Sequence, residues 1–395
     1  MKKTFLLSCL MLAAMPVMAA YTGHVYVDKN KNGVFDQSEK PLAGIKVSDG
    51  LNVVETAADG SFTLPGHERE RFIFITTPSG YKTFNRHYHK IEEKQSGYDF
   101  GLIPYSGRIR KDGSHRYIHI TDTEIFNTEN HADWVNNVRD YARNEQAAFI
   151  IHTGDICYEK GLKAHIKLMN TENMDCPVFY CIGNHDLVKG KYGEELFESI
   201  YGPVYYSFDA GNVHYVVTPM SGGDHAPGYT SDDVCRWLKN DLAHIRPGTP
   251  VVVFNHDLLT YEDTFIFKSK NAGSINLNEY NLKAWVYGHW HINYMKKQGD
   301  VYSVCTSSLD KGGIDHSTTA FRVMHVDSKG DFTSELRYTY LDKNICIASP
   351  AGVMASGVLP VAVNVYSSVS PVREVLYTCL ADGKPVLKNK RLLQS

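Results

Sequence analysis

Alternation of polar and apolar residues dominates the start of the chain. In residues 21–105, stretches such as 23–27 and 60–64 have an apolar residue at every second position, so their apolar side chains lie on one face of a strand. Frequent Gly, Asp and Asn residues separate these stretches and are typical of turns between strands. The pattern predicts a small all-β domain over residues 21–105.

Residues 106–343 show a different pattern, in which apolar runs alternate with segments of helical spacing. Four runs have the length and composition of buried strands. They span residues 117–120, 149–152, 178–182 and 251–254. Residues 131–146 and 232–244 instead repeat apolar side chains at helical intervals. This alternation predicts an α/β layered domain.

The last part of the chain, residues 344–395, returns to β-like alternation, for example over 361–366. This length is short for a complete sandwich. We expect either a partial β-module packed on the preceding domain or a chain that ends early.

Residues 1–20 have the features of a signal peptide. Two lysines open the segment, an apolar run follows over residues 5–17, and Ala19 and Ala20 suit cleavage. The run is too short to span a bilayer comfortably, and no later segment is apolar enough for a transmembrane helix. We therefore predict export to the periplasm or the medium. Acylation of Cys9 in a lipoprotein is the less favoured alternative.

Composition narrows the classes of function. The 395 residues are 43% hydrophobic and 22% charged, as in soluble globular proteins. A formal net charge of -3 argues against nucleic-acid binding, which normally requires a basic excess. Removing Cys9 leaves an odd number of cysteines, which cannot all pair within the chain. Several of them lie in apolar runs, so we expect buried free thiols.

The apolar runs of the central region end in residues that bind metals. Five predicted strand ends present Asp, Asn or His side chains. These residues are Asp122, Asp155, Asn184, His256, His289 and His291. In α/β sheets the functional site lies beyond the carboxyl ends of the strands. Carboxylates together with neutral imidazoles suit a pair of divalent cations.

These motifs, taken in order, resemble the calcineurin-like metallophosphoesterases, in particular a secreted bacterial branch with an N-terminal β-domain and a C-terminal β-module. The motifs are Asp122 with Glu124, Gly154-Asp155, Gly183-Asn184-His185-Asp186, Asn255-His256 and Gly288-His289 with His291. The resemblance covers roughly residues 115–327. It implies a β-sandwich core flanked by helices, and two divalent ions of Mn, Fe, Zn or Mg.

The resemblance also implies a role for each residue. One metal would be held by Asp122, Glu124 and His291, and the other by Asn184, His256 and His289, with Asp155 bridging the two. His185 would contact the phosphate and protonate or stabilise the leaving oxygen, and Asp186 would orient His185. The implied activity is hydrolysis of a phosphate monoester or diester by metal-bound hydroxide.

Glu124 departs from the family pattern, which has His or sometimes Gln at this position. Glutamate is a hard ligand, so it could bind the first metal directly, bind it through water, or miss it. The alternative function is therefore a catalytically weak or inactive surface protein that binds metals and a phosphorylated ligand.

A second metal motif lies in the N-terminal domain. Residues 28–39 fit the twelve-residue calcium loop, with oxygen ligands at its first, third, fifth, seventh, ninth and twelfth positions. The candidate ligands are Asp28, Asn30, Asn32, Val34, Asp36 and Glu39. The flanking segments are of strand type, as in the calcium-binding β-modules that the stretch resembles. The alternative is a polar hairpin loop without a metal.

Overall fold

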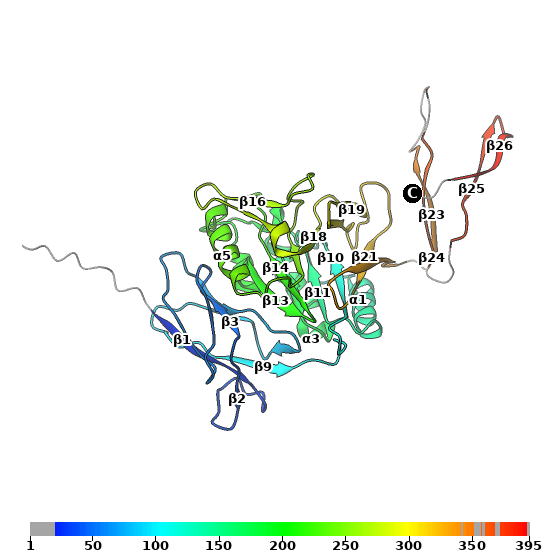
Figure 1. Ribbon diagram of the computed structural model, residues 1–395. Coiled ribbons are helices and arrows are strands. Elements are labelled where there is room, and N and C mark those ends of the chain that lie inside the picture. Colours follow the sequence, from blue (N-terminus) through cyan, green and yellow to red (C-terminus); the bar gives the residue numbers. More distant parts are fainter. Residues whose placement is uncertain (1–19, 341–342, 351–356, 358–359, 368–371, 393–395) are drawn as a thin grey trace, which may run out of the picture.

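The molecule consists of an N-terminal β-region, a central α/β region and two C-terminal hairpins (Figure 1). The computed structural model describes residues 20–340, 343–350, 357, 360–367 and 372–392. The predicted signal peptide lies outside the described residues except for Ala20.

The N-terminal region contains two small sheets that pack around a shared core. Its strands are β1 (Tyr21–Val27), β2 (Lys40–Pro41), β3 (Lys46–Ser48), β4 (Val53–Glu55), β5 (Ser61–Leu64), β6 (Phe72–Ile75), β7 (Tyr81–Thr83), β8 (Tyr88–Lys90) and β9 (Phe100–Pro104). One sheet has the order β2-β1-β9-β7 with β5 paired to β1, and the other has the order β4-β3-β6-β8. Alternate side chains such as Val25, Leu64 and Ile75 are fully buried between them.

The central region is built on two larger sheets. The first has the order β12 (Val178–Tyr180), β11 (Phe149–His152), β10 (His115–Ile120), β21 (Ala320–Val326), β22 (Phe332–Tyr338). The second has the order β13 (Tyr206–Ala210), β14 (Val213–Val217), β15 (Val251–Phe254), β18 (Leu282–Tyr287), β20 (Val301–Cys305), β19 (Tyr294–Gln298). A separate short hairpin joins β16 (Ile266–Lys268) to β17 (Ser274–Asn276).

The helices cover the outer faces of these sheets. They are α1 (Ala132–Asn144), α2 (Tyr158–Leu168), α3 (Thr171–Met174), α4 (Glu195–Tyr201) and α5 (Ser231–Ala243), with 3₁₀ turns η1 (Asn184–Asp186) and η2 (Leu277–Tyr280). The two helices predicted from the sequence correspond to α1 and α5. A capping box between Thr230 and Asp233 fixes the start of α5.

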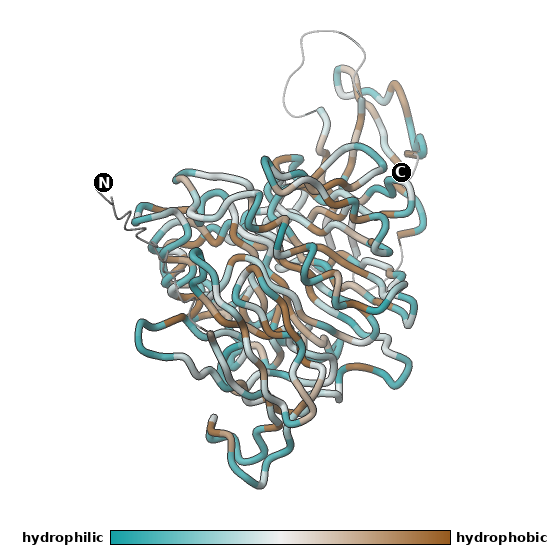
Figure 2. Tube along the Cα trace, turned by 60° about the vertical axis from the view of Figure 1, so that its left-hand side comes forward, coloured by the Kyte–Doolittle hydropathy of each residue, from teal (hydrophilic) through white to brown (hydrophobic). Residues whose placement is uncertain are grey.

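Side chains of the first sheet alternate between two cores. Phe149 and Ile151 face the second sheet, where they pack with Tyr215 and Phe254. Ile150 faces the opposite way, toward the core that the helices cover. Figure 2 shows hydrophobic positions concentrated within these layers and hydrophilic positions in the loops. The predicted fold, a layered α/β core of two sheets flanked by helices, is confirmed.

A buried polar network joins the N-terminal region to the central one. His214 lies between two carboxylates, with Nε2 2.8 Å from Asp241 Oδ2 and Nδ1 2.7 Å from Asp209 Oδ1. Lys46 of the N-terminal region approaches Asp209 to 3.9 Å. Burial opposes protonation of His214, but the charge of Asp241 and the two hydrogen bonds outweigh it and raise the pKa of His214. His214 and Lys46 thus share the carboxylate of Asp209 at the contact between the two regions.

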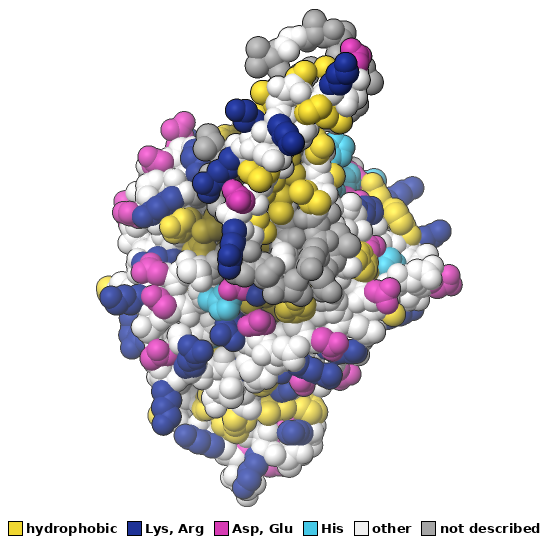
Figure 3. All heavy atoms as spheres, turned by 90° about the vertical axis from the view of Figure 1, so that its right-hand side faces the viewer, with side chains coloured by type: hydrophobic (Ala, Val, Ile, Leu, Met, Phe, Trp, Pro, Cys, Tyr) yellow, Lys and Arg dark blue, Asp and Glu magenta, His cyan; other side chains and the backbone are white. Residues whose placement is uncertain are grey.

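The C-terminal residues form two separate hairpins, β23 (Lys343–Ser349) with β24 (Ala362–Ser367), and β25 (Leu376–Ala381) with β26 (Lys384–Arg391). Figure 1 shows them standing beside the α/β region. They expose apolar side chains such as Ile345, Leu380 and Val386. Figure 3 shows hydrophobic side chains gathered at this end of the molecule, whereas acidic and basic side chains mix over the rest of the face.

Two further sequence expectations concern thiols and the membrane. Cys157, Cys176, Cys181, Cys235 and Cys305 are free and buried, and Cys346 and Cys379 are free and partly exposed. Within the described ranges no helix is long and apolar enough to cross a membrane.

Candidate metal centre

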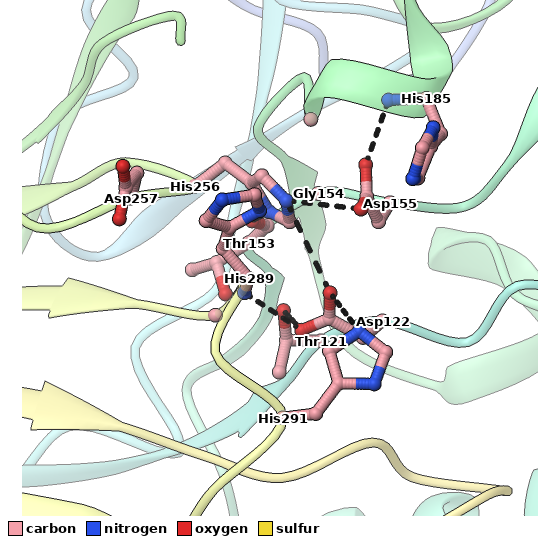
Figure 4. Close-up of polar contacts among 12 residues, drawn as sticks. Thr121, Asp122, Thr153, Gly154, Asp155, His185, His256, Asp257, His289 and His291 are labelled. Carbon is pink, nitrogen blue, oxygen red and sulfur yellow. Dashed lines mark hydrogen bonds and ion pairs between the residues drawn. The ribbon is translucent and has the colours of Figure 1, made fainter. Parts of the chain in front are cut away.

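The predicted ligands meet where the carboxyl ends of the strands converge. Strands β10, β11 and β12 run parallel to one another in the first sheet, and β14, β15 and β18 do so in the second. The segments that follow these strands place Asp122, Asp155, His256, His289 and His291 around one space (Figure 4). The site therefore lies where the two sheets present their parallel strand ends together.

The first group of ligands comprises Asp122, Glu124 and His291. The Nε2 atom of His291 lies 3.2 Å from Asp122 Oδ1 and 3.4 Å from Glu124 Oε1. The second carboxylate oxygen of Asp122 accepts hydrogen bonds from the Thr121 hydroxyl and from the backbone N–H of His289. Oδ1 thus remains directed at the centre.

The second group comprises Asp155, His256 and His289. The Nε2 atom of His256 lies 3.1 Å from Asp155 Oδ2 and 4.0 Å from Asp122 Oδ1, so the two groups adjoin. The imidazole rings of His256 and His289 are 5.0 Å apart. Asp155 Oδ1 accepts a hydrogen bond from the backbone N–H of His185 at 3.0 Å.

A backbone contact fixes the orientation of His256. Its Nδ1 lies 2.7 Å from the carbonyl oxygen of Thr153. Because a carbonyl only accepts, Nδ1 carries a proton, and Nε2 is the ring nitrogen that faces the carboxylates. Metal-binding histidines are commonly oriented in this way.

Strained backbone is concentrated at the predicted ligands. Five of them have positive φ angles: Asp122 (50°), Glu124 (44°), Asp155 (55°), His289 (63°) and His291 (49°). Non-glycine residues seldom occupy this region, and such strain costs on the order of 1–3 kcal/mol per residue. Because the strain is clustered at one site, we infer that the fold holds these side chains in place at a cost in local stability.

The chemistry of the centre suits bound cations. Asp122 Oδ1, Asn184 Oδ1 and His256 Nε2 are buried and lack a hydrogen-bond partner among the described residues. Burial disfavours the charged imidazole of His256, but the carboxylates of Asp155 and Asp122 outweigh it and raise the pKa of His256 to about 9. The close carboxylates of Asp122 and Glu124 raise the pKa of His291 to about 10. The centre is therefore strongly negative, and its unpaired donor atoms are those that divalent metals use.

The predicted partner of His185 requires a correction. Asp186 is buried, and its two carboxylate oxygens accept hydrogen bonds from the backbone N–H groups of Cys157 and Gly183. It therefore fixes the turn around the ligands and does not orient the imidazole. His185 Nδ1 instead lies 2.8 Å from Asp224 Oδ2.

Asp224 belongs to the loop 221–228, which contains three glycines. Its backbone N–H donates to the carbonyl oxygen of Asn184 at 3.0 Å, which anchors the loop to the ligand segment. Burial opposes protonation of His185, but the hydrogen bond that its Nδ1 donates to Asp224 and the charges of Asp155, Asp224 and Glu124 raise the pKa of His185.

Glu124, the departure from the family pattern, has a cationic neighbour. Lys311 Nζ forms an ion pair with Glu124 Oε2, while Oε1 faces His291. The hydrogen bonds and charges of these two residues outweigh burial and lower the pKa of Glu124. The glutamate is thus held as a carboxylate at the first group. Lys311 lies 187 positions away in the sequence, and no sequence motif marks it.

The calcium-loop candidates are held by hydrogen bonds within their own loop. The two carboxylate oxygens of Asp28 accept hydrogen bonds from the backbone N–H groups of Asn32 and Gly33. The side-chain amides of Asn30 and Asn32 donate to Asp36 Oδ2 at 2.7 and 3.0 Å. Glu39 accepts from the backbone N–H groups of Lys29 and Asp36, and Val34 is exposed. The loop lies between strands β1 and β2.

Sequence comparisons match most of this architecture to one family. Residues 115–293 match the family described as calcineurin-like phosphoesterase, and residues 29–104 match the N-terminal region of calcineurin-like phosphoesterase. Purple acid phosphatase 13 of Arabidopsis thaliana is 29% identical over 142 residues, which are 33% of this chain and 25% of that protein. The chain thus spans a quarter of the length of this curated relative.

Solved structures with a similar chain path include a dimetal phosphatase from Danio rerio. It is 12% identical, with a TM-score of 0.39 over 55% of this chain and 98% of that one. GAP50 of Plasmodium, described as an anchor in the inner membrane complex, is 14% identical, with a TM-score of 0.37 over 57% of this chain and 85% of that one.

Proposed function

Because the chain belongs to the calcineurin-like phosphoesterase family, we propose that it is a secreted, metal-dependent phosphoesterase that hydrolyses a phosphate monoester or diester. The observation that carries the proposal is the meeting of two ligand groups, Asp122, Glu124 and His291 with Asp155, His256 and His289. Asn184, the remaining ligand predicted for the second group, has a buried amide oxygen without a hydrogen-bond partner among the described residues.

The residues of the site have different roles in hydrolysis. The two ligand groups would hold two divalent ions, and these would supply orientation of the phosphate and activation of the attacking water. Asp155 lies between the two groups and can serve both. His185, one-third exposed and outside both groups, is available to contact the phosphate and to donate a proton to the leaving oxygen.

Turnover with added manganese tests this proposal. We expect the purified protein to hydrolyse 4-nitrophenyl phosphate or bis(4-nitrophenyl) phosphate, and the ratio of the two rates separates monoesterase from diesterase activity. His185→Ala should lower kcat by about a hundredfold, as loss of a general acid does, with metal content unchanged. Equal loss of turnover and metal would remove the catalytic role of His185. No turnover across a wide range of phosphate esters would favour the alternative, a binding protein for phosphorylated ligands.

Export is the second element of the proposal. Support comes from the basic, apolar and small-residue pattern of residues 1–20. Expression of the full chain with a C-terminal tag, followed by fractionation and N-terminal sequencing, tests it. We expect a mature chain that begins at Tyr21, and a full-length chain retained in the cytoplasm would contradict the proposal.

Calcium binding by residues 28–39 is the third element. Its support is the ligand spacing, together with the hydrogen bonds that hold Asp28, Asp36 and Glu39 within one loop. Calcium should raise the Tm of the wild type and leave that of Asp36→Ala unchanged. An equal response of both proteins would contradict the assignment.

A further inference from the structure

Two aromatic side chains lie stacked on the surface beside the metal centre. The rings of Phe126 and Tyr158 have centroids 6.1 Å apart and planes 17° from parallel. Phe126 is 53% exposed and Tyr158 is 43% exposed. Most other aromatic side chains of the described ranges are buried or half-buried, so this exposure is unusual for the chain. We call this pair the aromatic wall.

The aromatic wall spans the space between the first ligand group and His185. Phe126 follows Glu124 by two residues, and Lys311, the partner of Glu124, lies 5.8 Å from the centre of its ring. At the other end, the ring of Tyr158 lies 5.3 Å from the imidazole of His185. One edge of the site therefore consists of a cation, two aromatic rings and the predicted proton donor, in that order.

The backbone holds Tyr158 in this place against its local preference. Its φ angle is 54°, and that of the preceding Cys157 is 74°, both in the left-handed region. Bulky residues are rare there. The conformation starts helix α2 and leaves the ring over the surface, where it gains little from burial. An exposed apolar surface beside a polar site is typical of ligand contact.

We propose that the aromatic wall is the leaving-group subsite of the enzyme and that it stacks on a planar ring, which favours aryl or nucleoside phosphates over aliphatic ones. The inference rests on the proposed phosphoesterase function. The leaving oxygen must lie near His185 to receive its proton, so the group attached to that oxygen extends over the adjacent ring of Tyr158. Planar rings stack on aromatic side chains, and Lys311 adds a positive charge at the far end.

Binding measurements test the subsite without turnover. Phenylphosphonate and methylphosphonate differ in the ring alone and contain no ester bond. By calorimetry on the manganese-loaded protein, we expect phenylphosphonate to bind about tenfold more tightly. Replacing both wall residues by leucine, Phe126→Leu with Tyr158→Leu, keeps an apolar side chain and should remove most of this preference. Equal binding of the two phosphonates by the wild type would overturn the proposal.

Steady-state kinetics distinguish an aryl group from a nucleobase as the ring that the subsite prefers. For wild type, kcat/KM should be higher for 4-nitrophenyl phosphate or adenosine 5′-monophosphate than for glycerol 2-phosphate, and the preferred one identifies the ring as aryl or nucleobase. The leucine variant should raise KM for the preferred ester about tenfold and raise KM for glycerol 2-phosphate by a much smaller factor. Phe126→Tyr, which keeps the ring, is the matched control and should retain the preference.

Failure of this inference differs from failure of the proposed function. Hydrolysis of all three esters at similar efficiency, or an equal loss for all three in the leucine variant, would overturn the subsite and leave the phosphoesterase intact. A clear phenylphosphonate preference without turnover of any ester would support the subsite and overturn the activity.

Discussion

The contact between His185 and Asp224 gives a prediction about how a proton reaches the leaving group. Asp224→Asn keeps the shape of the side chain and removes its charge, 2.8 Å from the imidazole. If His185 donates a proton to the leaving oxygen, the carboxylate favours its protonated form. The variant should therefore lose activity without losing metal.

The size of the loss follows from the distance and the exposure. Two unit charges 2.8 Å apart attract by about 1.5 kcal/mol at the dielectric constant of water. The side chains of His185 and Asp224 are 34% and 39% exposed. Solvent therefore screens their attraction, and its net contribution should be about 1 kcal/mol. That energy corresponds to a rate loss of about fivefold.

The assay compares two aryl phosphates that differ in how much their leaving groups need a proton. Phenol is a poorer leaving group than 4-nitrophenol, so Asp224→Asn should lower kcat by about fivefold for phenyl phosphate and by less for 4-nitrophenyl phosphate. Asp300→Asn, which removes a fully exposed carboxylate, is the control. An equal loss for both esters, or a parallel loss of bound metal, would refute the reasoning.

Three further predictions concern the metal ligands and the stability of the fold. Asp155→Asn should reduce the metal content, measured by mass spectrometry, from two ions per chain to one or fewer, because this carboxylate faces both groups; two retained ions would contradict it. Gly154→Ala should lower the free energy of unfolding, measured in urea, by about 2 kcal/mol. The φ angle of Gly154 is 99°, and a Cβ atom there would lie 2.7 Å from His256 Nδ1. An unchanged unfolding midpoint would contradict this prediction. The raised pKa of His214 should stabilise the fold below about pH 6.5, with the contribution lost as pH rises through the folded-state pKa. His214→Gln should flatten this decline of Tm above pH 6.5, and an unchanged slope would show that another group controls it.

Local sequence patterns were sufficient for the predicted strands, for helices α1 and α5 and for most of the candidate ligands. Apolar runs become buried strands because burial of alternate or continuous side chains is a property of the segment itself. The residues after Ile120, His152, Phe254 and Tyr287 were predicted to meet because parallel strands end at the same edge. Helix α2 was missed because Gly161 interrupts its pattern. That glycine is needed there because a Cβ atom would lie 2.3 Å from the carbonyl oxygen of Ile125.

The partners of these residues depended on the tertiary structure. Asp186 follows His185 directly, yet backbone N–H groups in the buried turn take both of its carboxylate oxygens. Asp224, 39 positions away, reaches the imidazole because its loop is anchored on the carbonyl oxygen of Asn184. Neither outcome can be read from spacing along the chain.

The sequence by itself thus determined the strands, the family motifs and the residues able to bind cations. Only the folded chain decided that Lys311 pairs with Glu124 and that Phe126 and Tyr158 stack beside His185. The physical reason is that periodicity and motif order are short-range properties, whereas contacts between loops depend on how distant strands pack and where their ends meet.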